Sequence, residues 1–281
     1  MSIPRTPAKQ TARFRLPLAR SAERIARIAG SGFLFSLFGI GAVGLAAALL
    51  PAARLRARAG EAADLVAQRW ISRAFAAFIE IGRRIHIWDF EVSGFDRLSE
   101  PGQLIVANHP TLIDVVLLLA RIPQCDCVVK RAAWRNPALA GIVRAAGYVP
   151  NDDGSAMIDA CVERLRAGRS LLLFPEGSRS PEEGFRRFER GAAHVAIRAG
   201  MPVIPVYIDC RPPALKKGQA WYALPNALMR FRLRAGEPID VRPLIDATAP
   251  ARISARRVNA AILRYFESER LAADRAQASG S

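Results

Sequence analysis

Cysteine and histidine are scarce in this chain of 281 residues, and their spacing excludes most of the sites they usually build. The four cysteines show neither zinc-ligand nor thiol-redox spacing. Cys125 and Cys127 lie in a predicted strand, where alternate residues share a face, so we expect them in the core. The G-x-S-x-G motif of the usual serine hydrolases is missing, and so is any internal repeat. We therefore expect no metal site and a reduced, cytosolic environment.

Acidic residues are also few, because 25 Asp and Glu stand against 41 Lys and Arg, for a formal net charge of +16. Such an excess predicts an anionic partner: a membrane surface, a phosphorylated substrate or nucleic acid. Nearly all the cations are Arg, and a genome-wide bias towards Arg and Ala would give the same excess without a partner. The arginines are spread along the chain without a nucleic-acid-reading motif, so we expect no nucleic acid partner.

The N-terminal part of the chain combines a basic segment with a long apolar one. Residues 1–29 are polar and basic, and residues 30–50 contain no charge over 21 positions. At ~1.5 Å per residue this stretch is long enough to cross a bilayer core of ~30 Å. Its length argues against a cleavable signal peptide; the alternative is a buried helix of a soluble protein. Residues 61–85 show helical apolar spacing with arginines among them, which favours an interfacial helix.

Both flanks of residues 30–50 are basic, which bears on their orientation. A single crossing would put one basic cluster outside, against the positive-inside tendency. A re-entrant or shallow helix with both ends in the cytosol avoids this. We therefore predict a basic N-terminal segment (1–29), a membrane anchor (30–86) and a catalytic domain (87–281) on the cytosolic face of the cytoplasmic (inner) membrane.

Beyond residue 88 short apolar runs alternate with helical patterns. The predicted strands are residues 90–93, 104–107, 125–130, 171–174, 203–208 and 231–235. The predicted helices are residues 112–120, 137–146, 156–167, 191–198 and 253–273. This alternation predicts an α/β domain with a mostly parallel sheet flanked by helices.

Residues 103–114, QLIVANHPTLID, contain the first candidate site. An apolar strand runs into Asn108-His109-Pro110 and then into a helix, and Pro110 is tolerated at such a junction. Five helical steps would put His109 and Asp114 about 140° apart, so they meet only if His109 lies in the turn before the helix. There they would form a His–Asp dyad, in which Asp114 orients the imidazole and His109 takes a proton from a hydroxyl. The alternative is a capping or packed histidine beside a cap-region Asp.

Residues 171–180, LLLFPEGSRS, contain the second candidate site. A predicted strand ends at Phe174-Pro175, and ligands in open α/β sheets lie beyond the carboxyl ends of strands. Arg179 would clamp a phosphate through its planar guanidinium, and Gly177 would let backbone N–H groups approach an anion. Glu176 would orient Arg179 or contact a substrate hydroxyl. The alternative is a plain turn with a solvated Glu–Arg pair.

Together with IPVYI (204–208), these two blocks resemble the 1-acylglycerol-3-phosphate acyltransferase family of lysophospholipid acyltransferases, over residues 90–235. The resemblance implies a glycerolipid acyltransferase-like fold and acyl transfer from acyl-CoA or acyl carrier protein, as co-substrate and without a cofactor, to a membrane lipid acceptor such as 1-acylglycerol-3-phosphate. It implies that His109 is the general base and Asp114 its orienting partner. The residues it implies for acceptor binding are Asn108, Glu176, Gly177, Ser178 and Arg179.

One block departs from the family pattern Gly-x-x-Phe-Ile-x-Arg. The matching stretch is residues 147–153, where Asp153 holds the Arg position and Asp152 precedes it. Two carboxylates there disfavour a phosphomonoester. Either nearby cations supply the charge instead, or the acceptor has another head group, such as an amine-bearing or specialised lipid. The candidate cations are Lys130, Arg131 and Arg135.

Other functions compatible with the sequence are a lipid- or acyl-carrier-binding adaptor and a thioester hydrolase. The intact pairs His109/Asp114 and Glu176/Arg179 argue against an adaptor without turnover, and the missing serine motif argues against the usual hydrolase route.

Overall fold

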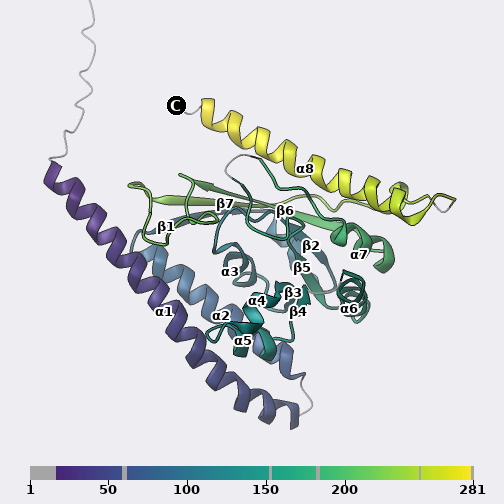
Figure 1. The fold of residues 1–281 in the computed structure, drawn as a ribbon, viewed down its shortest axis with the longest axis horizontal. Helices are drawn as coiled ribbons and strands as arrows, with labels where there is room; N and C mark the ends of the chain where they lie inside the picture. The colour runs from purple at the N-terminus through teal and green to yellow at the C-terminus, as the bar shows by residue number, and fades with distance from the viewer. Residues whose placement is uncertain (1–16, 59–61, 152–153, 182–183, 247, 280–281) are drawn as a thin grey trace, which may run out of the picture.

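The structure, a computed structural model, describes residues 17–58, 62–151, 154–181, 184–246 and 248–279 (Figure 1). Residues 1–16, most of the predicted basic N-terminal segment, lie outside this part of the chain. Asp152 and Asp153, the departure from the family pattern, also lie outside the described residues.

A seven-stranded sheet, ordered β1-β7-β6-β2-β5-β3-β4, forms the centre of the molecule. Its strands are β1 (Trp88–Ser93), β2 (Leu104–Ala107), β3 (Cys125–Lys130), β4 (Val149–Asn151), β5 (Ser170–Leu173), β6 (Val203–Arg211) and β7 (Met229–Ala235). Neighbouring strands are parallel except β6 and β7. The central strands β2 and β5 are buried throughout, which explains their unbroken apolar sequences.

Helices cover both faces of the sheet (Figure 1). They are α1 (Pro17–Arg58), α2 (Ala63–Arg84), α3 (Asp114–Leu119), α4 (Arg131–Arg135), α5 (Ala140–Ala145), α6 (Gly154–Arg166), α7 (Gly191–Ala199) and α8 (Ala251–Ser279), with 3-10 turns η1 (Phe95–Leu98) and η2 (Arg242–Leu244). Alternation along β2 separates two cores: Ile105 packs with α2 and α3, whereas Leu104 and Val106 pack with α7 and α8. The predicted α/β fold with a mostly parallel sheet is confirmed.

The sequence-based elements match the structure with a few differences. The strand β4 and the short helix α4 were missed, and the helix expected over residues 137–146 is confined to α5, residues 140–145. Cys125 and Cys127 are buried in the core, as alternation predicts. Among the described residues no cluster of His, Cys, Asp or Glu is arranged to hold a metal ion.

The two N-terminal helices differ in how they are buried. The segment Glu23–Ala48 of α1 is long and apolar enough to cross a membrane, and little of it is buried. The helix begins at Pro17, well before the apolar run, because the basic residues there do not interrupt a helix. α2 buries an amphipathic face that includes Ile71 and Phe78. The division into segment, anchor and domain stays a prediction.

An ionic cluster attaches α2 to the sheet. Arg169, at the start of β5, donates from Nε to Asp126 Oδ2 at 2.6 Å and from Nη2 to Asp126 Oδ1 at 2.8 Å. Its Nη1 donates to Asp64 Oδ2 on α2 at 2.7 Å, and Gln68 Nε2 donates to Asp126 at 2.9 Å. Since Asp126 is fully buried, α2 is held to the domain by charges that water barely screens.

Candidate active site

His109 and Asp114 are in contact at the junction between β2 and α3. The His109 Nδ1 to Asp114 Oδ2 distance is 2.7 Å, and the Asp114 side chain is fully buried. Asp114 also accepts hydrogen bonds from the Thr111 N–H at 2.6 Å and from Thr111 Oγ1 at 2.5 Å. Three donors therefore satisfy a carboxylate that would otherwise be costly to bury. The pairing that the spacing predicts is present, with His109 in the turn and Asp114 as the first residue of α3.

The imidazole is held from a second side by an aromatic ring. The His109 and Phe174 ring centroids are 4.6 Å apart, and Phe174 follows the last residue of β5. Because Nδ1 is used by Asp114, Nε2 is the ring nitrogen left for a ligand, and His109 lines a cavity. The arrangement presents an oriented imidazole at a cavity wall, which is what a general base requires.

Glu176 connects the two sequence blocks. It is 4% exposed, and its Oε1 accepts from the His109 N–H at 3.0 Å and from Ser180 Oγ at 2.6 Å. Its Oε2 accepts from the Arg186 N–H at 3.0 Å. The sequence suggested that Glu176 orients Arg179 or meets a substrate hydroxyl. The structure instead gives its carboxylate three protein donors and makes it the brace behind His109.

Asn108 has a similar bracing position. Its Nδ2 donates to the Ile208 carbonyl at 2.8 Å, and its Oδ1 accepts from the Ile208 N–H at 2.7 Å. The amide thus continues the pairing between β2 and β6 where the backbone of β2 turns away. Both polar ends of Asn108 are used by the protein, and the substrate contact that the family resemblance implies stays a prediction.

Arg179 reaches a third segment, the loop after β6. Its Nη1 donates to the carbonyls of Leu215 at 3.1 Å and Lys216 at 2.8 Å. Gly177 and Ser178 line the same cavity as His109 and Arg179. Gly177 has a φ of 59°, in the left-handed region that favours glycine, so the Pro175–Arg179 turn depends on it.

The cavity has a volume of about 730 Å³, within the ordinary range for small-molecule sites. Its lining combines apolar side chains with polar and charged ones. The apolar lining includes Leu112, Val115, Val128, Ala133, Leu139, Met157, Leu173 and Phe174. Such a lining suits a ligand that has both a chain of methylene groups and a polar head group.

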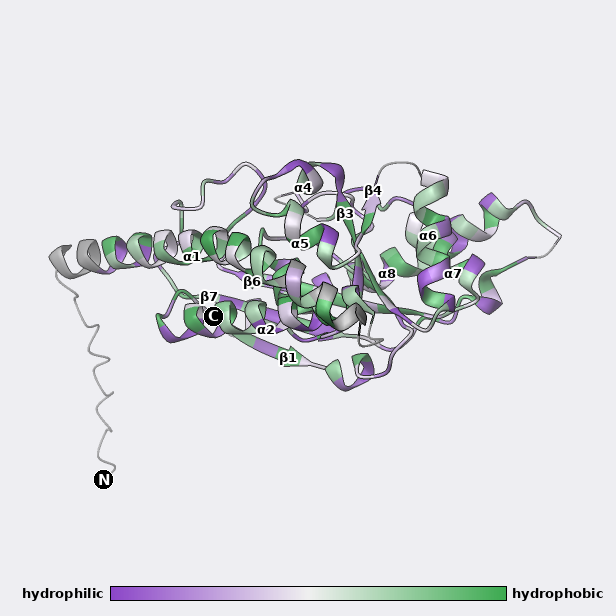
Figure 2. Ribbon diagram, turned by 90° about the horizontal axis from the view of Figure 1, so that it is seen from below, coloured by the Kyte–Doolittle hydropathy of each residue, from purple (hydrophilic) through white to green (hydrophobic). Residues whose placement is uncertain are grey.

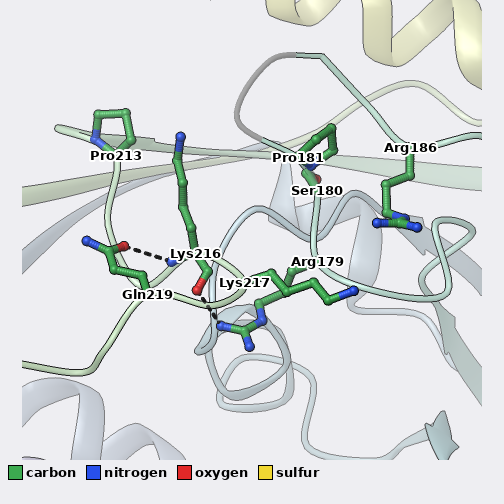
Figure 3. A pocket seen from close by; sticks show the side chains of 8 residues that line it. All are labelled: Arg179, Ser180, Pro181, Arg186, Pro213, Lys216, Lys217 and Gln219. Carbon is green, nitrogen blue, oxygen red and sulfur yellow. Dashed lines mark hydrogen bonds between the residues drawn. The ribbon is translucent and has the colours of Figure 1, made fainter. Parts of the chain in front are cut away.

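Four cations lie close together at this cavity and the hollow beside it. Lys130, Arg179 and Lys217 line the cavity, and Arg186 lines the adjoining hollow of about 620 Å³ together with Arg179 and Lys217. Burial and then repulsion by Lys217, Arg186 and Arg179 lower the pKa of Lys130. Figure 3 shows the Lys217 side chain extending towards Arg186, while Lys216 turns towards Pro213. Cations that repel one another at a cavity mark an anion site.

Only part of this cation set was predicted from the sequence. Lys130 is in place, whereas Arg131 and Arg135 are exposed on α4 and do not line the cavity. Lys217 and Arg186 were missed. Their only sequence signal was the Lys216-Lys217 pair, two of the few lysines in an arginine-rich chain.

Comparisons with known proteins place the chain among acyltransferases. Residues 89–209 match the family model described as Acyltransferase. The chain is 30% identical over 211 residues to the lyso-ornithine lipid O-acyltransferase of Pseudomonas aeruginosa, covering 72% of this chain and 77% of that protein. It is 28% identical over 145 residues to the chloroplastic 1-acyl-sn-glycerol-3-phosphate acyltransferase BAT2 of Brassica napus, covering 48% of this chain and 42% of that protein. The chain also matches the 1-acyl-sn-glycerol-3-phosphate acyltransferase alpha of Mus musculus, of which it covers 53%. It therefore spans about half the length of these glycerophosphate relatives.

A solved structure shares the fold. It is the 1-acyl-sn-glycerophosphate (LPA) acyltransferase PlsC of Thermotoga maritima, with a TM-score of 0.62 and 21% sequence identity. The match covers 89% of this chain and 98% of that one, so it includes the N-terminal helices as well as the sheet.

Proposed function

The chain belongs to the 1-acylglycerol-3-phosphate acyltransferase family, and on that premise we propose that it transfers a fatty acyl group from an acyl thioester to the free hydroxyl of a lysolipid. The observation that carries the proposal is the His109–Asp114 pair at the wall of a cavity whose lining includes both apolar side chains and cations. A thioester donor, a lipid acceptor and a general base account for all three features.

The reaction needs one base and no acyl-enzyme intermediate. His109 Nε2 takes the proton of the acceptor hydroxyl while the hydroxyl oxygen attacks the thioester carbonyl carbon. The tetrahedral intermediate then expels the thiolate, the C–S bond breaks, and the imidazolium returns its proton to sulfur. Asp114 accepts the Nδ1–H throughout, which fixes the tautomer and stabilises the imidazolium. The products are an ester and a free thiol, either CoA or the carrier protein.

The cation set supports an anionic acceptor head group. Lys130, Lys217 and Arg179 line the cavity close to one another and would bind the phosphate of 1-acylglycerol-3-phosphate. Arg186 adds charge from the adjoining hollow. These cations would replace the missing Arg of the family's second block.

A second acceptor is favoured by a separate observation. The match to the lyso-ornithine lipid O-acyltransferase extends further along both chains than the glycerophosphate matches quoted above. Ornithine bears an amine and a carboxyl group but no phosphate, and in the sequence Asp153, preceded by Asp152, stands where the family pattern has Arg. A lyso-ornithine lipid is therefore the second candidate acceptor.

We further propose that the chain is held at the cytosolic face of the cytoplasmic membrane. The exposed apolar segment Glu23–Ala48 supports attachment, and basic residues on both sides of it support a re-entrant or shallow position. A lipid acceptor and product would then enter and leave the cavity without crossing water.

The test is an acyl-transfer assay with the full chain in lipid vesicles. The acyl donor is either labelled acyl-CoA or carrier protein loaded with the labelled acyl group, and the acceptor is either lysophosphatidic acid or lyso-ornithine lipid. Each pair is assayed with wild type and with Asp114→Asn. We expect a labelled diacyl product with one acceptor, and a rate reduced by about 10²-fold or more in Asp114→Asn because the imidazole loses its orienting carboxylate. No product with either acceptor, from folded protein, would contradict the proposal.

A further inference from the structure

A loop between β6 and β7, residues 215–224 with the sequence LKKGQAWYAL, packs against α1 and is here called the aromatic loop. Ser31 Oγ of α1 donates to the Trp221 carbonyl at 3.3 Å, and the Phe35 and Trp221 ring centroids are 6.1 Å apart. A Cβ on Gly32 would lie 3.3 Å from the Trp221 ring, so the helix and the indole are in close contact. The loop is therefore fixed to the helix that is apolar enough to enter a membrane.

The other end of the loop is fixed to the active site. The Leu215 carbonyl accepts from the Leu112 N–H at 3.0 Å, and Leu112 lies between His109 and Asp114 in the chain. The carbonyls of Leu215 and Lys216 also accept from Arg179. Leu215 is buried with a φ of 55°, a left-handed conformation that a branched residue adopts only when its surroundings require it. The loop thus joins α1 directly to the mouth of the cavity.

The middle of the loop is braced by its own hydrogen bonds. Gln219 Oε1 accepts from the Lys216 N–H at 3.0 Å, and Gln219 Nε2 donates to the Ala223 carbonyl at 2.6 Å. Despite this order, Trp221 and Tyr222 are 42% and 56% exposed, with their rings edge to face at 5.4 Å. Two neighbouring aromatic side chains exposed to solvent are typical of an interaction surface.

These rings lie beside the exposed apolar face of α1. This face carries four exposed apolar side chains, those of Ile25, Phe33, Ile40 and Val43. On a helical wheel, at ~100° per residue, they fall within an arc of about 80°. On the same wheel Gly32, which touches Trp221, lies only about 20° outside that arc. Figure 2 shows apolar residues along much of α1. The aromatic loop and this face of α1 therefore form one continuous apolar surface.

We propose that the aromatic loop is a second membrane contact, in which Trp221 and Tyr222 insert at the boundary between head groups and acyl chains of an anionic bilayer. Trp and Tyr are enriched at this depth because each has an apolar ring and a polar atom. Lys216 and Lys217 precede the rings, and cations close to an anionic membrane surface strengthen attachment to it. Since Lys217 also lines the cavity, the contact places the cavity mouth at the membrane surface.

This inference rests on the proposed membrane attachment but not on turnover, so the test reads depth as well as activity. All four native cysteines are buried, which lets a thiol-reactive, polarity-sensitive fluorophore label an introduced cysteine selectively. The probe position is Tyr222→Cys in the full chain. The matched control is Ser268→Cys, an exposed site on α8, which lies across the sheet from α1 (Figure 1). Each labelled variant is added separately to vesicles of phosphatidylglycerol and phosphatidylcholine.

We expect the fluorophore at 222 to shift to the blue and to be quenched by lipids brominated near the head group, while the fluorophore at 268 stays in water. Equal quenching of both by aqueous iodide would overturn the proposal. So would a blue shift that appears without lipid as protein concentration rises, which would assign the loop to contact between copies of the chain.

Activity provides the second measurement. Trp221→Ser should slow transfer to a long-chain acceptor embedded in vesicles but leave transfer to a water-soluble, short-chain acceptor unchanged. Equal loss with both acceptors would show that the loop only supports the fold. If wild type transfers no acyl group at all, the proposed function fails, while the depth measurement still decides the position of the loop.

Discussion

Replacing Glu176 with Gln tests whether this residue supports the site from behind or touches the substrate. The carboxylate accepts from two donors at Oε1, the His109 N–H and Ser180 Oγ, and from one at Oε2, the Arg186 N–H. In the best orientation of Gln, its oxygen keeps the first two bonds. Its amide then faces the Arg186 N–H, so one hydrogen bond is lost and two donors point at each other.

The magnitude follows from these bonds. Hydrogen bonds to a charged group contribute roughly 1.5–3 kcal/mol each, and neutral ones about 1 kcal/mol. Losing one bond and weakening two others, partly offset by the easier burial of a neutral group, should lower the free energy of unfolding by about 2–3 kcal/mol. A native domain with roughly 5–15 kcal/mol of stability remains folded.

The functional effect should fall on kcat. Glu176 holds the backbone of His109, and a displacement of about 1 Å at a catalytic group costs on the order of 10²-fold in rate. We therefore expect kcat to fall by about 10- to 100-fold, with an acceptor KM close to that of wild type. The assays are thermal unfolding in detergent and steady-state transfer in vesicles.

Two variants serve as controls. Glu189→Gln removes an exposed carboxylate at the same cavity and should change neither stability nor kcat. Ser180→Ala removes one hydrogen-bond donor to Glu176 and should lower the free energy of unfolding by about 1 kcal/mol. A Glu176→Gln variant with unchanged stability and a raised acceptor KM would refute the bracing role and restore the substrate contact suggested by the sequence.

Two further predictions concern charge. Acceptor binding should weaken as pH rises through the lowered pKa of Lys130, because burial and the neighbouring cations make its ammonium lose its proton at lower pH than an ordinary lysine. Lys130→Arg, which stays protonated, should flatten this profile of acceptor KM against pH; the same profile in both proteins would exclude Lys130 from the anion site. Asp126→Asn should lower the free energy of unfolding by about 3 kcal/mol, because Arg169 loses a buried counterion. A change below about 1 kcal/mol, the size of a surface pair, would contradict a structural role for that cluster.

The sheet was largely predictable because its central strands are short, unbroken apolar runs. β2 and β3 begin and end where the sequence places them. β4 was missed because it has only three residues and contains Pro150, which removes a backbone donor. The N-terminal extension of α1 was missed because charged and apolar residues form helices equally well, so composition does not mark where this helix begins.

The site was predictable where its residues are close in sequence. The spacing of His109 and Asp114 requires a turn between strand and helix, and their contact follows from it. Asn108 bonds backbone groups 100 residues away, and no pattern in the chain announces such a partner. Lys217 joins Lys130 only because the order of the sheet brings the loop after β6 to the cavity, and a sequence without contacts does not give that order.

His109→Ala, compared with wild type in vesicles containing the preferred acceptor and a labelled acyl thioester, tests the central claim most directly. The matched control is His194→Ala, a half-buried histidine on α7 outside the cavity lining. We expect His109→Ala to lose transfer by at least about 10³-fold, with thermal unfolding close to that of wild type, and His194→Ala to keep its rate. Near wild-type transfer by folded His109→Ala would contradict the proposed role of the dyad and require another base.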